Sequence, residues 1–213
     1  MDRIACIVGG VKQSDYIFPE GAFIIAADLG YKHLKDKNIT PDLAVGDFDS
    51  LGFVPTDVPV IRHPVRKDDT DTLLAAREGL SRGYKIFILY GCIGGARLDH
   101  TLANLQTLAF IAENGAVGFM TDGVQVITAI KNSTLSFDAS ERGTVSVFCI
   151  GADAQGVSIE GLEYPLNNVT LTASMPLGVS NAFTGEPAFI SVRKGTLCIL
   201  WRKPIEELLN DLK

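Results

Sequence analysis

The chain has 213 residues, a formal net charge of -6 and a pI near 5.0. This length can bury a substantial core in one domain or two. The acidic balance argues against nucleic acid as the main partner, because a surface that follows a phosphate backbone is usually basic.

Short apolar runs in the first part of the chain predict buried parallel strands. Several of them are β-branched, and they cover residues 4–8, 23–27, 43–45, 58–61 and 85–90. Such continuous apolarity is typical of strands buried on both faces. Leucines with helical spacing follow Thr70 and Asp99, and we expect Gly83 and Gly115 to end these two helices. The alternation over residues 1–123 predicts a Rossmann-like α/β domain with a mainly parallel sheet.

The pattern changes after Asp122 and Gly123. Apolar and polar residues then alternate in runs such as 144–148, 169–172 and 188–192. Alternation between turn residues predicts antiparallel strands in a sandwich or a small barrel, so we expect a second, antiparallel β domain over residues 124–213. The last segment carries an apolar stripe, and Pro204 suits the first position of a short terminal helix. Trp201, at the end of an apolar run, is expected to belong to the core.

The cysteines indicate a reducing compartment. Cys6, Cys92, Cys149 and Cys198 are widely separated, and none forms a paired metal-binding spacing. No apolar stretch approaches the roughly 20 residues that span a bilayer, and the start of the chain has no signal pattern. We therefore expect a cytoplasmic protein with reduced thiols and no membrane contact.

Aspartates stand where predicted strands end or predicted helices begin, at positions 28, 47, 49, 68, 69, 71 and 99. In an open parallel sheet these points share one edge, so the acids are expected to converge on one crevice. If the extended conformation persists beyond the strand, Asp47 and Asp49 would point to the same side, within reach of a hard cation such as Mg²⁺. Each acid alone is more simply explained by a turn or a helix cap, but their convergence favours a metal-dependent site for an anionic ligand.

A glycine-rich turn links the strand at 85–90 to the following helix. Glycines let the backbone approach a ligand, and amides at a helix start favour an anion. Arg97 can bind phosphate oxygens with both arms of its guanidinium, and Asp99 lies beside it. The turn therefore predicts phosphate binding, whereas His100 is more simply explained as a structural residue.

These motifs, in this order and spacing, resemble thiamine pyrophosphokinase. They are ADLG at 27–30, PDLAVGDFDS at 41–50, DDTD at 68–71 and GGARLDH at 94–100, with further similarity at 161–166 and 178–181. The resemblance implies an ATP-binding catalytic domain, a thiamine-binding β-sandwich and a homodimer with active sites between subunits. The family transfers the pyrophosphoryl group of ATP to the hydroxyl of thiamine, giving thiamine diphosphate and AMP with Mg²⁺ as cofactor.

The resemblance also implies roles for individual residues. Asp47, Asp49 and Asp71 would hold Mg²⁺ and, with Asp99, form the catalytic set. The ATP site would contain Asp28, Asp68, Thr70, Gly95 and Arg97, and the thiamine site would contain Ser180 and Asn181. Either Asp71 or Asp99 is a candidate to accept the proton of the thiamine hydroxyl.

Two departures and two alternatives accompany this interpretation. Leu29 stands where the family usually has glycine, and Ala96 separates the glycine pair from Arg97.

The sequence DFDS at 47–50 also looks like the nucleophile motif of haloacid-dehalogenase-type phosphatases, although it follows a third predicted strand and not the first. A non-catalytic nucleotide-binding module would keep the phosphate-binding glycines but would have little use for so many carboxylates.

Overall fold

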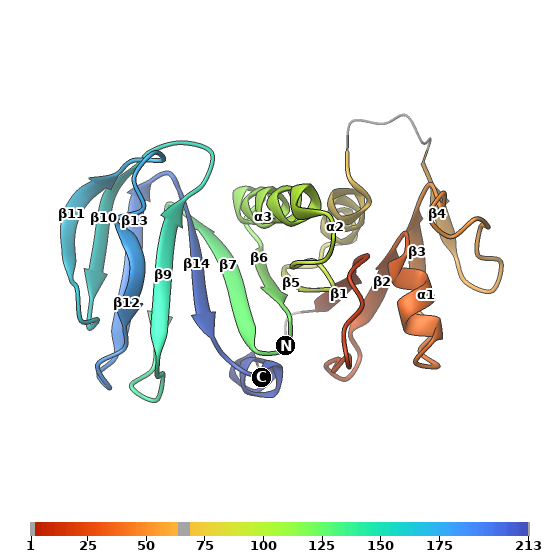
Figure 1. Cartoon of the computed structure of the whole chain (residues 1–213), viewed down its shortest axis with the longest axis horizontal. Coiled ribbons are helices and arrows are strands. Elements are labelled where there is room, and N and C mark those ends of the chain that lie inside the picture. The colour runs from red at the N-terminus through yellow and green to blue at the C-terminus, as the bar shows by residue number, and fades with distance from the viewer. Residues whose placement is uncertain (1–2, 64–68, 213) are drawn as a thin grey trace.

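The structure, a computed structural model, describes residues 3–63 and 69–212. Parallel strands form one end of a ten-stranded sheet in the order β6-β5-β1-β2-β3-β4 (Figure 1). Their bounds are β1 Ile4–Val8, β2 Phe23–Ala27, β3 Leu43–Gly46, β4 Val60–Arg62, β5 Ile86–Tyr90 and β6 Val117–Thr121. The register places Cys6 of β1 between Ile24 of β2 and Ile88 of β5. The strands predicted from apolar runs are therefore confirmed, with small shifts at their ends.

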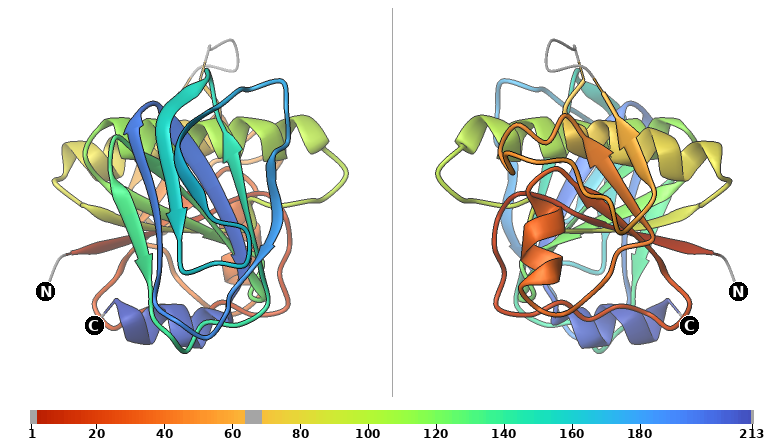
Figure 2. Two further views of the ribbon diagram at one scale, coloured as in Figure 1. Left: turned by 90° about the vertical axis from the view of Figure 1, so that its left-hand side faces the viewer. Right: turned by 90° about the vertical axis from the view of Figure 1, so that its right-hand side faces the viewer.

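Helices cover both faces of this parallel end. α2 (Asp71–Ser81) and α3 (Leu98–Glu113) pack on one face, and α1 (Gly30–Lys35) packs on the other (Figures 1 and 2). Gly83 and Gly115 follow α2 and α3 with φ angles of 82° and 67°. This left-handed conformation suits glycine and ends a helix, as expected from the sequence.

Antiparallel strands continue the same sheet in the order β7, β14, β9 and β12. Their bounds are β7 Gln125–Lys131, β14 Thr196–Arg202, β9 Thr144–Cys149 and β12 Gly178–Ala182. A separate four-stranded sheet faces them and contains β11 Leu166–Leu171, β10 Ala154–Glu160, β13 Ala188–Lys194 and β8 Thr134–Phe137 (Figure 2). The predicted β-sandwich is therefore present. The division at residue 123 stays a prediction, because it falls in the turn between β6 and β7, across which the sheet is continuous.

One apolar core lies on one face of the long sheet and extends from its parallel end to its antiparallel end. It contains Val8 of β1 and Leu34 of α1 and continues to Val147 of β9 and Ile190 of β13. α1 covers this face at the parallel end, and the four-stranded sheet covers it at the antiparallel end. Trp201 belongs to this core and is 3% exposed, which confirms its expected structural role.

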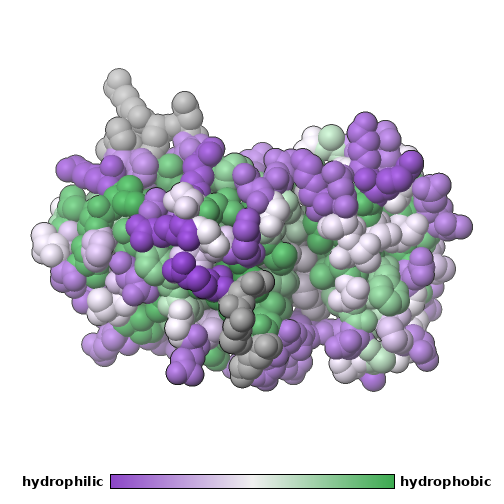
Figure 3. All heavy atoms as spheres, turned by 180° about the vertical axis from the view of Figure 1, so that it is seen from behind, coloured by the Kyte–Doolittle hydropathy of each residue, from purple (hydrophilic) through white to green (hydrophobic). Residues whose placement is uncertain are grey.

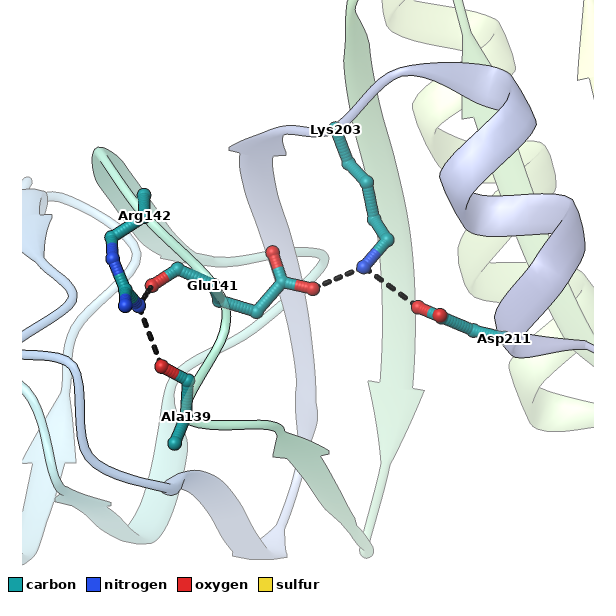
Figure 4. A network of polar contacts seen from close by, with 5 residues as sticks. All are labelled: Ala139, Glu141, Arg142, Lys203 and Asp211. Carbon is teal, nitrogen blue, oxygen red and sulfur yellow. Dashed lines mark hydrogen bonds and ion pairs between the residues drawn. The ribbon is translucent and has the colours of Figure 1, made fainter.

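The terminal helix α4 (Ile205–Asp211) closes one end of the sandwich (Figure 2). Pro204 occupies its N-cap and not the first helical position that the sequence predicted. Beside it, the buried Lys203 Nζ donates hydrogen bonds to carboxylate oxygens of Glu141 and, at 2.7 Å, of Asp211 (Figure 4). Burial alone would lower the pKa of Lys203, but its hydrogen bonds to Asp211 and Glu141 raise it. The ion pairs therefore tie α4 to the loop before β9.

Seen from behind, the surface mixes polar residues with smaller apolar areas over both ends of the molecule (Figure 3). The four cysteines are free thiols, and Cys149 is only half-buried. Within residues 3–63 and 69–212, none of the helices combines the length and the apolarity that crossing a membrane requires.

Candidate active site

A cavity of about 560 Å³ lies at the carboxyl ends of the parallel strands. It is lined by the segments 10–12, 27–29, 70–72 and 94–97, together with Ser50. The chain builds the sheet outward from β1 through β2 and β3 to β4, and then places β5 on the opposite side of β1. Open α/β sheets bind ligands at such a reversal of strand order, so the cavity is the candidate site.

Three carboxylates meet at the edge of this cavity. Asp28, Asp47 and Asp49 each offer an oxygen within 4.8 Å of the others. The predicted metal-binding set was Asp47, Asp49 and Asp71, so Asp28 joins the first two, whereas Asp71 lines the cavity at the start of α2. Carboxylate oxygens suit a hard cation such as Mg²⁺, which is usually held by one or two of them together with water and phosphate oxygens.

The carboxylates converge through a tight turn. β3 ends at Gly46, and the buried Phe48 has a φ of 63°, so the extended conformation of the strand does not persist through Asp47 and Asp49. The backbone N–H of Asp49 donates to Oδ1 of Asp47 at 3.1 Å. A left-handed, non-glycine residue is uncommon and concentrates at functional sites.

The pKa of Asp28 is raised by its surroundings. Burial raises the pKa of its carboxyl group, a hydrogen bond from the Ser50 side chain lowers it, and the charges of Asp71 and Asp47 raise it further. Its Oδ1 is buried without a hydrogen-bond partner among the residues that the structure describes. A cation bound beside Asp28 would satisfy this oxygen and offset the repulsion, so the residues present fit a metal ion.

The departure at Leu29 is explained by the backbone. Asp28 itself has a φ of 45°, and Leu29 has ordinary helical angles, so position 29 requires no glycine. A Cβ at Gly30 would lie 1.9 Å from the carbonyl oxygen of Val8. Glycine is therefore needed at position 30, where α1 approaches β1.

Thr70 and Asp71 organise the start of α2. Thr70 is the N-cap, and its Oγ1 accepts a hydrogen bond from the backbone N–H of Leu73 at 3.2 Å. The neighbouring Asp69 forms an ion pair with Arg77 at 3.0 Å, which engages it outside the carboxylate cluster. Asp68, a predicted ATP-site residue, lies outside the described residues.

The glycine-rich turn packs against the loop that follows β1. Gly94 and Gly95 have φ angles of 74° and 79°, and a Cβ at Gly95 would lie 2.9 Å from Cγ2 of Val11. A Cβ at Gly91 would lie 2.4 Å from the backbone oxygen of Val11. These glycines therefore allow two loops to approach each other at the cavity, where backbone amides can face an anion.

Arg97 and Asp99 form a pair at the start of α3. Arg97 lines the cavity, and its guanidinium donates to both carboxylate oxygens of Asp99, at 2.6 Å and 3.0 Å for the shortest contact to each. Hydrogen bonding from Arg97 lowers the pKa of Asp99 to about 2. Asp99 does not line the cavity, so Asp71 is better placed than Asp99 to receive a proton there.

The predicted thiamine-site residues lie far from the cavity within one chain. Ser180 and Asn181 belong to β12, at the opposite edge of the ten-stranded sheet (Figure 1). Asn181 is buried, its Nδ2 donates to the carbonyl oxygen of Tyr164 at 2.7 Å, and its Oδ1 accepts from the Tyr164 N–H at 2.9 Å. The structure therefore gives the Asn181 amide a role in holding the loop before β11.

Sequence reasoning missed the loop after β1 and the polar residue Asn104. Residues 10–12 line the cavity, and Nδ2 of the buried Asn104 donates to the carbonyl oxygen of Cys92 at 2.9 Å. The signal that was available for the loop is the pair Gly9 and Gly10 directly after the first predicted strand.

Comparisons with known proteins agree with this arrangement. The family model described as "Thiamin pyrophosphokinase, catalytic domain" matches residues 15–117, and the model described as "Thiamin pyrophosphokinase, vitamin B1 binding domain" matches residues 132–197. Thiamine pyrophosphokinase of Bacillus subtilis (strain 168) is 28% identical over 214 residues, with coverage of 94% of this chain and 98% of the relative.

Solved structures extend the similarity to the whole fold. The crystal structure of the Bacillus subtilis thiamine pyrophosphokinase matches with a TM-score of 0.81 and 25% identity, over 95% of this chain and 99% of that one. The thiamin pyrophosphokinase of Geobacillus thermodenitrificans matches with a TM-score of 0.77 and 25% identity, over 94% and 97% of the two chains. The yeast enzyme, at 15% identity, shares the fold with a TM-score of 0.76 over 98% of this chain and 89% of its own. Because both family models match in order along the chain, it belongs to the thiamine pyrophosphokinase family.

Proposed function

We propose that the protein transfers the pyrophosphoryl group of ATP to thiamine, giving thiamine diphosphate and AMP. The observation that carries this proposal is the cavity where the glycine-rich turn at 94–97 and the carboxylates of Asp28 and Asp71 face one space. A phosphate-binding turn beside clustered carboxylates suits a nucleotide with its metal ion. We infer that thiamine is the acceptor from the family to which the chain belongs.

The chemistry requires positioning and charge compensation more than covalent help. The hydroxyethyl oxygen of thiamine attacks the β-phosphorus of ATP, the bond from that phosphorus to the oxygen bridging it to the α-phosphate breaks, and AMP leaves with this oxygen. Asp28, Asp47 and Asp49 would hold Mg²⁺, which when bound neutralises the phosphate charge; the predicted role of Asp71 as a further ligand stays a proposal. The amides of the glycine-rich turn would hold the phosphates in line with the attacking oxygen.

Asp71 is our candidate for the group that receives the hydroxyl proton. It lies in the first turn of α2 and lines the cavity, whereas Asp99 is held by Arg97 outside it. A carboxylate in this position can orient the hydroxyl and accept its proton during the attack.

A homodimer would complete the site. Ser180 and Asn181 lie at the far edge of the sheet from the cavity, so they can join it only if another chain supplies them. An apolar groove of about 490 Å³ runs between α3 and the strands β9 and β14. Leu102 and Phe148 in this groove are 57% and 39% exposed. Exposed apolar surface of this kind is typical of a protein interface and supports association of two copies.

The free cysteines support action in a reducing compartment such as the cytoplasm.

The test of the function uses purified protein with ATP, Mg²⁺ and thiamine, followed by chromatographic separation of nucleotides and thiamine species. We expect AMP and thiamine diphosphate in equal amounts, only when Mg²⁺ is present. Release of inorganic phosphate alone would instead indicate a phosphatase, and bound but unchanged ATP would indicate a nucleotide-binding module.

A further inference from the structure

We propose that Lys12 binds the phosphate chain of the nucleotide, a role that rests on the proposed function of the cavity. Lys12 lies in the loop between β1 and β2 and lines the cavity. This loop meets the glycine-rich turn, where Gly95 leaves no room for a Cβ beside Val11. Lys12 therefore stands next to the segment whose amides are best placed to receive phosphate oxygens.

The backbone on the N-terminal side of Lys12 is fixed by the sheet. The N–H of Gly9 donates to the carbonyl oxygen of Tyr90 at 2.8 Å, and the N–H of Val11 donates to that of Gly91 at 2.9 Å. These bonds extend the pairing of β1 with β5 beyond the end of both strands. The residue before Lys12 is therefore held in one position relative to the phosphate-binding turn.

Side chains hold the loop on both sides of Lys12. His33 of α1 donates from Nε2 to the carbonyl oxygen of Gly10 at 2.9 Å, because a carbonyl can only accept. Gln13 donates from Nε2 to the carbonyl oxygen of Thr121 at 2.7 Å. With neighbours fixed at positions 10, 11 and 13, the loop presents Lys12 to the cavity without a large ordering cost on binding.

No residue in the described parts of the chain pairs with the charge of Lys12. Its side chain is exposed and makes no hydrogen bond or ion pair with another residue in the described parts of the chain. Arg97, which also lines the cavity, already donates to both oxygens of Asp99. A triphosphate entering beside the carboxylates of Asp28 and Asp71 needs positive charge that is not already compensated, and a lysine ammonium is a common phosphate ligand.

The test compares binding of two probes by calorimetry with the full-length protein and Mg²⁺. The probes are α,β-methylene-ATP, which carries the phosphate chain, and adenosine, which lacks it. We expect Lys12→Ala to weaken binding of the ATP analogue about tenfold or more, since hydrogen bonds to charged groups are among the strong ones. Adenosine affinity should stay unchanged, and Lys12→Arg should restore most of the analogue affinity.

Lys194→Ala is the matched control, because Lys194 is an exposed lysine at the end of β13 and does not line the cavity. It should bind both probes like the wild type, and the deficit of Lys12→Ala should shrink as ionic strength rises. Unchanged analogue affinity in Lys12→Ala, or an equal loss for adenosine, would overturn the role of Lys12. A wild-type protein that binds the analogue but transfers nothing to thiamine would overturn the proposed function while leaving the Lys12 measurement interpretable.

Discussion

Asp28→Asn is expected to stabilise the metal-free protein and to remove its response to Mg²⁺. Asparagine has the same shape as aspartate and also tolerates the left-handed conformation that Asp28 adopts at φ 45°. The substitution removes one negative charge from the cluster with Asp47 and Asp49. The free protein therefore loses a repulsion, whereas the cation loses a ligand.

The size of the gain follows from the geometry of the cluster. At 4.8 Å, two unit charges repel by about 0.9 kcal/mol in water and by about 3.5 kcal/mol at an effective dielectric constant of about 20. Because Asp28 is half-buried and Asp49 is exposed, we take the lower end, about 1 kcal/mol. For a protein of this size, that free energy raises the melting temperature by roughly 2–4 °C.

The pH dependence has a definite sign. The folded-state pKa of Asp28 is raised, first by burial, so its stabilising contribution is present in acid and is lost as the pH rises through that pKa. Asp28→Asn should therefore exceed the wild type in stability at neutral pH, and the gap should close as the pH falls.

The assay is thermal unfolding with chelator and with Mg²⁺, at several pH values. Asp36→Asn is the matched control, because Asp36 is exposed at the end of α1 and lies outside the cluster. A lower melting temperature for Asp28→Asn in chelator, or a Mg²⁺-induced shift equal to that of the wild type, would refute the reasoning.

Three further predictions concern Asp71 and Thr70 at the start of α2 and the ion pairs of Lys203 beside α4. Asp71→Asn should abolish pyrophosphoryl transfer while the circular dichroism spectrum stays unchanged; near-normal turnover would remove Asp71 from the site. Thr70→Ala should lower the free energy of unfolding in urea by about 1 kcal/mol, because the N–H of Leu73 loses its acceptor, and Thr70→Ser should retain most of it. Lys203→Met should cost about 3 kcal/mol in the same assay by leaving Glu141 buried without its partner, and no loss would show that the ion pair contributes nothing.

The helices and strands were predictable because apolar runs and glycines mark them in the sequence. Buried parallel strands such as β1 and β5 read as continuous apolar runs, and Gly83 and Gly115 mark helix ends because they adopt angles that other residues avoid. The sharing of one sheet between both ends of the chain was not predictable in this way, because it depends on the pairing of β6 with β7 across a turn.

The site was predictable in composition more than in arrangement. That Asp28, and not Asp71, lies with Asp47 and Asp49 depends on left-handed angles at Asp28 and Phe48, which the residue pattern does not reveal. The internal hydrogen bonds of Asn181 depend on where Tyr164 lies in space, 17 positions away along the chain. Lys12 has no acidic residue directly beside it in the sequence and belongs to no repeated spacing. Only its place at the cavity therefore indicates a binding role.

Because the sheet is continuous, the chain cannot be produced as two independent fragments. Met120 of β6 pairs with Ile127 of β7, and Oγ1 of the buried Thr128 donates to the carbonyl oxygen of Gly118 at 2.7 Å. Cutting the chain at residue 123 would expose a new strand edge on each fragment, with unpaired backbone groups beside apolar side chains. Each fragment produced alone is therefore expected to aggregate, and the two produced together are expected to recombine through these edges into a complementing pair.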